Sequence, residues 1–289
     1  METSSHLPLN KEALLGLLDD PSPLVRRTLL GYFQSVGHAG ERFLRELADG
    51  SNRIAAGHAQ WYLSELKFAD PASEFRGFIR SLNYELETGV LLLCRTVYPS
   101  LEISRFCQEL DRIASRCREL MSATLPGREK CKIINRVLFH EYGFRGNVED
   151  YTDPENSFLN RVLETRKGLP ISLSILYLLI AERCGVRLEP VGLPGHFVVG
   201  CFRDTQVFYI DPFDRGRFLS SEELLGYLAG RELSAQNRTL APTTVREVLA
   251  RCCRNLANHY AEAGLQPLAR MFASFVEEFD TALEPRASS

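Results

Sequence analysis

Two side chains that can exchange protons stand near the ends of neighbouring predicted strands. His196 opens the apolar segment HFVVGCF, and Asp211 closes the segment QVFYID. A hairpin with a two-residue loop at Arg203-Asp204 places His196 directly opposite Asp211, with their Cβ atoms about 4.5–5.5 Å apart. A carboxylate at that distance can orient an imidazole that takes and gives protons, or the pair can simply fasten two strands. Arg-Asp is not a preferred hairpin turn, and a shift of one residue would put the two side chains on opposite faces.

The elements that must position this pair are a buried helix and a small sheet. The helix predicted over residues 171–184 contains the run ISLSILYLLIA, which is shorter than the roughly 18–20 residues of a membrane span. After Gly185 the apolar period changes to that of strands, in VRLEPVG, HFVVGCF and QVFYID. The sequence therefore predicts a mostly helical α+β fold with a small antiparallel sheet near residues 186–218.

The overall composition excludes several classes of function. The chain has 289 residues, 45% of them hydrophobic and 25% charged, with a net charge of −3. This balance gives no electrostatic case for binding nucleic acid or an anionic membrane. The N-terminal segment lacks the features of a secretory signal, so we expect a cytoplasmic protein with reduced thiols. None of the eight cysteines lies in a C-x-x-C pair, and we expect neither a metal nor another cofactor.

Helical segments flank the central region on both sides. Residues 11–66 predict two helical hairpins, and the run D-D-P-S-P-L-V-R-R within them resembles a HEAT repeat. Residues 243–283 predict two amphipathic helices that meet at Gly264 and resemble a tetratricopeptide-type hairpin. With a probable boundary at Asp70-Pro71, we predict three domains, over residues 1–69, 70–230 and 231–289.

Several sequence blocks of the central region resemble those of one known family. The stretch from Gly143 to Val186, followed by PVGLPGHFVVG and FYIDPFDRG, closely resembles the bacterial SirB1 family, also called the transglutaminase-like UPF0162 family. The resemblance covers roughly residues 72–283 and leaves the HEAT-like segment outside. A related module also occurs in a eukaryotic F-box protein.

This resemblance implies a papain-like core that lacks its nucleophile. In such a core a cysteine begins a buried helix, whose N-terminus lowers the pKa of the thiol. A His and an Asp from neighbouring antiparallel strands face it, and His196 and Asp211 match them. The cysteine belongs to a G-x-C motif one helix length before the glycine that matches Gly185. Here Gly168-Leu169-Pro170 stands in its place, and Pro170 offers no nucleophile.

Other residues near this position are poor substitutes for the cysteine. If the alignment of the motif were wrong by one residue, Leu169 or Ile171 would take the place of the cysteine, and neither has a nucleophilic side chain. Ser172 points roughly 200° around the helix from position 170. Ser174 lies one turn further along on nearly the same face and is the least poor alternative, although we expect its hydroxyl to bond a carbonyl one turn back.

Two cysteines and one further histidine also need an interpretation. Cys184 lies at the far end of the helix, and Cys201 has the opposite strand parity to His196, so both are interpreted as core thiols. A metal site would need a third ligand beside His196 and Asp211. His140 is the obvious candidate, but it is expected on a helix surface.

A polar block before the buried helix supplies candidates for the walls of the cleft. Asn156 and Ser157 could line it, or they could cap a helix that starts at Phe158. Arg166 and Lys167 could bind an acidic ligand there or only solvate its rim.

The missing nucleophile favours a binding function over catalysis. We interpret the chain as a non-catalytic transglutaminase-like scaffold for a peptide or protein partner, in which His196 and Asp211 are a vestigial dyad. The alternative is a hydrolase or acyltransferase that uses this dyad with Ser174 or an activated water as the nucleophile.

Overall fold

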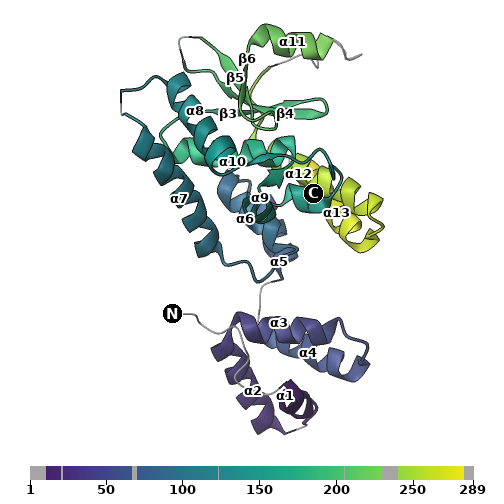
Figure 1. Ribbon diagram of the computed structural model, residues 1–289. Helices are drawn as coiled ribbons and strands as arrows, with labels where there is room; N and C mark the ends of the chain where they lie inside the picture. Colours follow the sequence, from purple (N-terminus) through teal and green to yellow (C-terminus); the bar gives the residue numbers. More distant parts are fainter. Residues whose placement is uncertain are drawn as a thin grey trace. The chain divides into compact units, whose positions relative to one another are not determined.

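The computed structural model of the protein describes residues 11–20, 22–66, 70–122, 124–204, 206–229 and 240–282. The chain divides into two compact units, and the boundary follows Ser73 in the first turn of α5 (Pro71–Ser81) (Figure 1). The further domain boundary predicted at residues 230–231 lies outside the described residues.

The described part of the first unit consists of helices that pack on one another. They are α1 (Lys11–Leu18), α2 (Pro23–Val36), α3 (His38–Ala48) and α4 (Arg53–Glu65). Proline begins α2, and Asp20 Oδ1 accepts a hydrogen bond from the backbone N–H of Ser22 at 2.8 Å, so the chain restarts where the sequence predicts. Leu14, Phe33 and Tyr62 are fully buried in a core that belongs to this unit.

The second unit is organised around α10 (Pro170–Arg183). Every residue of this helix from Pro170 to Ala181 is buried, because no face of the sequence is polar enough to meet solvent. It packs against α7 (Ile103–Leu120), α8 (Gly127–Asn135) and β4 (His196–Cys201). The helix predicted at residues 171–184 is therefore present and is covered on several sides.

Shorter elements surround α10 and complete the second unit. The remaining helices are α6 (Leu86–Arg95), a π-helical segment (Arg136–Glu141), a 3-10 segment (Pro154–Ser157), α9 (Leu159–Thr165), α11 (Ser221–Ala229), α12 (Val245–Glu262) and α13 (Gln266–Thr281). The other strands are β1 (Arg145–Gly146), β2 (Lys167–Gly168), β3 (Glu189–Leu193), β5 (Phe208–Asp211) and β6 (Arg217–Leu219). The predicted α+β class, mostly helical with a small antiparallel sheet, is confirmed.

The antiparallel sheet has the strand order β3-β4-β5-β6 and separates two layers of helix. Figure 1 shows α10 on one side of the sheet and α11 on the other. Val198 and Tyr209 point to the α11 side, where they form a cluster with Leu224 and Leu228. Residues of the opposite parity, such as Phe197 and Ile210, are fully buried on the other face of the sheet.

The predicted register between β4 and β5 is wrong by two residues. Val199 lies opposite Ile210 and Cys201 opposite Phe208, so the connection is longer than the two-residue loop expected at Arg203-Asp204. Arg-Asp lacks the glycine that usually follows asparagine or aspartate in a tight hairpin turn, which agrees with the longer loop. A shift of two preserves strand parity, so His196 and Asp211 still share a face.

The C-terminal hairpin of α12 and α13 belongs to the same compact unit as the sheet. The two helices pack against each other, and α12 also contacts α6 and the 3-10 segment. On α13, Phe275 makes an edge-to-face contact with Phe75 of α5, and Glu278 accepts a hydrogen bond from Arg76 at 2.6 Å. Segments from the two ends of this unit therefore lie side by side.

Removal of residues 240–289 is expected to abolish cooperative unfolding of the second unit. Phe158 would lose its ring contacts with Tyr260 and Phe272, at centroid distances of 6.5 and 6.2 Å, and a buried aromatic face would meet water. Thermal unfolding followed by circular dichroism measures this. Removal of residues 1–69 is the control and should leave the transition cooperative, whereas a cooperative transition in the chain lacking 240–289 would favour the predicted third domain.

Candidate functional site

His196 and Asp211 meet across the end of the sheet. The Nε2 atom of His196 lies 2.6 Å from Oδ2 of Asp211. His196 is the first residue of β4 and Asp211 the last of β5, so the pair is diagonal in the ladder instead of directly opposite. The side chains are 19% and 12% exposed respectively, and His196 Nδ1 bonds to no described residue. The predicted contact thus forms in a different register.

The second carboxylate oxygen of Asp211 organises the turn that follows β5. Its Oδ1 accepts hydrogen bonds from the backbone N–H groups of Phe213 at 3.0 Å and Asp214 at 3.2 Å. The Asp211 carbonyl also accepts from the N–H of Gly216 at 2.8 Å. This carboxylate therefore has a structural task that is independent of the imidazole.

Aromatic side chains surround the imidazole. The rings of Phe213 and Tyr227 each lie 6.2 Å from that of His196. Phe213 also packs directly on Gly146 of β1, where an added Cβ would come within 2.5 Å of its ring. The ring therefore contacts both the histidine and β1, the strand that pairs with β2 just before α10.

Arg251 of α12 binds the backbone on both sides of the turn between β3 and β4. Its Nη2 donates to the carbonyl of Leu193 at 2.8 Å and to that of His196 at 2.9 Å. Its guanidinium lies over the ring of Phe197, 5.3 Å from the centroid, and burial lowers its pKa. The sequence analysis missed this residue, although an arginine three positions after Val248 on an apolar helix stripe was a signal for it.

The N-terminus of α10 offers no nucleophile among the described residues. Pro170 is buried at the first helical position. Ser172 donates to the Asn156 carbonyl at 2.6 Å and accepts from the Leu169 N–H at 2.9 Å. Ser174 is fully buried and donates to the Phe197 carbonyl at 3.3 Å, so the expected bond one turn back is wrong. Close packing of α10 on β4 brings that strand carbonyl within reach.

The remaining candidates for a nucleophile or a metal ligand lie apart from the pair. Cys184 and Cys201 are both buried free thiols. His140 is exposed on the π-helical segment, as expected. Within the described ranges, no group of three or more His, Cys, Asp or Glu side chains is arranged to hold a metal ion. No described helix is long and apolar enough to cross a membrane.

The predicted capping role of Asn156 and Ser157 is wrong. Both residues belong to the 3-10 segment, which Asp153 caps, and α9 begins only at Leu159. Asn156 is buried, where its Oδ1 accepts from Asn147 Nδ2 at 2.9 Å. The side-chain amide of Asn156 is therefore bonded within this network and does not cap α9. The buried hydroxyl of Ser157 has no partner among the described residues.

The two cations before α10 point in different directions. Arg166 has a left-handed backbone with φ of 61°, and its Nη2 donates to Glu109 of α7 at 3.1 Å. Lys167 pairs with Glu149 at 3.0 Å. Arg166 is therefore held against α7, where it lines a separate pocket described below.

Substitution of Asp211 by alanine is expected to lower the free energy of unfolding by about 2–3 kcal/mol, because His196 and two backbone N–H groups lose their acceptor. Asp211→Asn keeps an oxygen for the turn and should cost about half as much. Chemical denaturation measures both values. Equal stability of Asp211→Ala and the unchanged protein would contradict a fastening role for the pair.

The comparisons with known proteins agree with this architecture. A model of the transglutaminase-like superfamily matches residues 104–254, just over half of the chain. The UPF0162 protein of Xylella fastidiosa strain Temecula1 is 35% identical over 184 residues, which are 61% of this chain and 65% of that protein. The UPF0162 protein of Vibrio cholerae is 28% identical over 149 residues, 51% of this chain and 55% of that one.

A eukaryotic relative shares the same region. F-box only protein 21 of Mus musculus is 31% identical over 208 residues, which cover 66% of this chain and 30% of that protein. The chain spans 65% and 55% of the length of these two bacterial relatives, and no solved structure matches it. The chain belongs to the transglutaminase-like superfamily and, within it, to the UPF0162 or SirB1 family.

Proposed function

We propose that this protein is a non-catalytic transglutaminase-like scaffold that binds a peptide or protein partner. The observation that carries the proposal is Pro170, buried at the start of α10 where the fold family places its nucleophilic cysteine. The nearby hydroxyls of Ser172 and Ser174 are both engaged in hydrogen bonds within the fold. Acyl transfer through a covalent intermediate needs a free nucleophile beside the base.

The surroundings of the dyad support a structural task for it. Asp211 serves the imidazole through one oxygen and the following turn through the other. Arg251 donates a hydrogen bond to the backbone carbonyl of His196 and so holds the start of β4 in place. Such a network rigidifies a sheet end whether or not a reaction takes place there.

The helices of the first unit support a binding role. Leu24 and Ile54 are 72% and 65% exposed, so apolar area on these helices is available for contact with a partner. A pocket of about 410 Å³ lies beside Ile54, and the guanidinium of Arg26 stacks over the ring of Trp61 in its wall at 5.6 Å. Exposed aromatic and arginine side chains are typical of protein-binding surfaces.

One observation favours the alternative of a hydrolase or acyltransferase. The imidazole of His196 is partly exposed, and its Nδ1 has no described partner. That nitrogen could take a proton from a water, which would then replace the missing cysteine as the nucleophile. Ser174 is a weaker choice, because its hydroxyl is fully buried.

The two functions differ in what happens to a bound peptide. We expect short glutamine- and ester-containing peptides, incubated with the protein and a primary amine, to be recovered unchanged in mass. The rate of cleavage, deamidation or amine incorporation should equal that of the buffer, because no acyl-enzyme can form. Mass spectrometry of the recovered peptides measures all three products.

The matched variants for this assay are His196→Ala and His140→Ala, the latter changing an exposed histidine on the π-helical segment. All three proteins should behave alike. Turnover that persists in His140→Ala and disappears in His196→Ala would overturn the proposal in favour of the hydrolase.

A further inference from the structure

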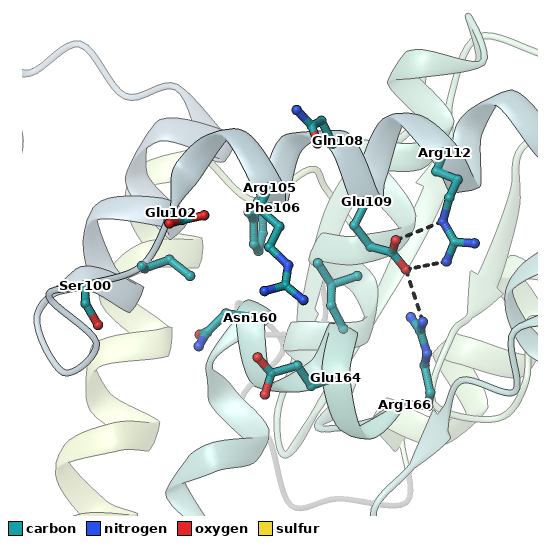
Figure 2. A pocket seen from close by; sticks show the side chains of 12 residues that line it. Ser100, Glu102, Arg105, Phe106, Gln108, Glu109, Arg112, Asn160, Glu164 and Arg166 are labelled. Carbon is teal, nitrogen blue, oxygen red and sulfur yellow. Dashed lines mark hydrogen bonds and ion pairs between the residues drawn. The ribbon is translucent and has the colours of Figure 1, made fainter. Parts of the chain in front are cut away.

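A second pocket lies between α7 and α9, and it shares no lining residue with the His196–Asp211 pair. Its volume is about 710 Å³, within the range of sites that enclose small ligands. Figure 2 shows α7 carrying Arg105 and Glu109 on one side and Asn160 and Glu164 on the facing segment. The pocket therefore lies within the second unit.

At one end of this pocket a single carboxylate is bonded to two arginines. Glu109 accepts two hydrogen bonds from Arg112, each 2.9 Å long, and a third from Arg166 at 3.1 Å. Arg166 is in turn stacked over the rings of Tyr142 and Phe144, at 5.5 and 4.7 Å. The hydrogen bonds from Arg112, ahead of those from Arg166, lower the pKa of Glu109, so this carboxylate stays ionised and fully engaged.

Arg105 differs from the other two arginines of the pocket, which are both bonded to Glu109. Its guanidinium points from α7 toward Asn160 and Glu164 in Figure 2. Glu164, however, forms its ion pair with Arg161 on its own helix. Among the described residues Arg105 has neither an ion pair nor a hydrogen bond. Its guanidinium group can therefore bind the carboxylate of a ligand through two parallel hydrogen bonds.

The floor between these two ends is apolar and contains one unsatisfied amide. Phe106 and Leu163 are buried beneath the opening. Asn160 is only 6% exposed, and its Oδ1 has no partner among the described residues. The Nη1 atom of Arg166 is buried and unpaired as well. Buried polar atoms without partners are costly, and a ligand with its own donors and acceptors relieves that cost.

We propose that this pocket binds a peptide segment of a partner protein in which an acidic side chain lies near an apolar one. Arg105 pairs with the carboxylate, the floor of Phe106 and Leu163 takes the apolar side chain, and the Asn160 amide bonds the peptide backbone. The inference rests on the proposed scaffold function and names the place and chemistry of its binding site. Formal charges in the pocket wall balance, which suits a peptide better than a multiply charged anion.

The test uses fluorescein-labelled short peptides on a Gly-Ser background, with one Leu or Phe and one Glu at varied spacing. A second set carries Lys in place of Glu. Fluorescence anisotropy with the full chain should show binding of the Glu set, weakened about tenfold or more by Arg105→Glu, because a charge-assisted bidentate pair is replaced by repulsion. The same variant should bind the Lys set better than the unchanged protein does.

Arg270→Glu is the matched control, because it makes the same charge change at an exposed position of α13 outside the pocket. It should leave both affinities unchanged. Arg105 is exposed, so its variant is expected to fold, and Arg105→Gln should give a smaller loss without reversing the preference.

The outcomes separate the two proposals. Binding of the Glu peptides that Arg105→Glu leaves intact would overturn this site while the scaffold function stands. Equal loss in Arg270→Glu would reduce the effect to net charge and would also overturn the site. Absence of binding to the unchanged protein overturns the site, and histidine-dependent turnover in the separate assay overturns the scaffold function itself.

Discussion

The burial of α10 on all sides is the constraint on which the second unit depends. A helix that is apolar around its whole circumference has no face for solvent, so other elements must cover it everywhere. In this protein α7, α8 and the sheet provide that cover. The same packing fixes two chemically important places, the N-terminus of α10 and the strand end that carries His196.

Within this frame, proline at the start of α10 has a physical advantage of its own. A cysteine there would leave an unpaired N–H at the helix end, whereas proline has none and is preorganised for the first turn. Ser172 then supplies an acceptor for the N–H of Leu169 and binds the Asn156 carbonyl. These two bonds tie the start of α10 to the segment that precedes it.

The sequence predicted the parts of this structure that follow from periodicity and missed those that follow from long-range contacts. The buried helix and the strands were predictable, because their apolar patterns repeat over many residues. The β4–β5 register was not, since the loop length depends on turn geometry that Arg203-Asp204 does not specify. An error of two residues in the register keeps each side chain on the same face of the sheet, and therefore His196 still contacts Asp211.

Residues that act from distant segments were the hardest to foresee. Arg251 reaches the carbonyl of His196 from a helix more than fifty positions later, and its place on an apolar stripe does not indicate which strand it contacts. Because Arg166 precedes α10 in the chain, its sequence position predicts a place near the dyad. Its left-handed backbone turns the side chain instead toward Glu109, where aromatic rings hold it. That single conformational choice helps to shape the second pocket, in which Arg105 pairs with no residue in the described part of the chain. The binding site that we propose therefore lies between α7 and α9, apart from the His196–Asp211 pair.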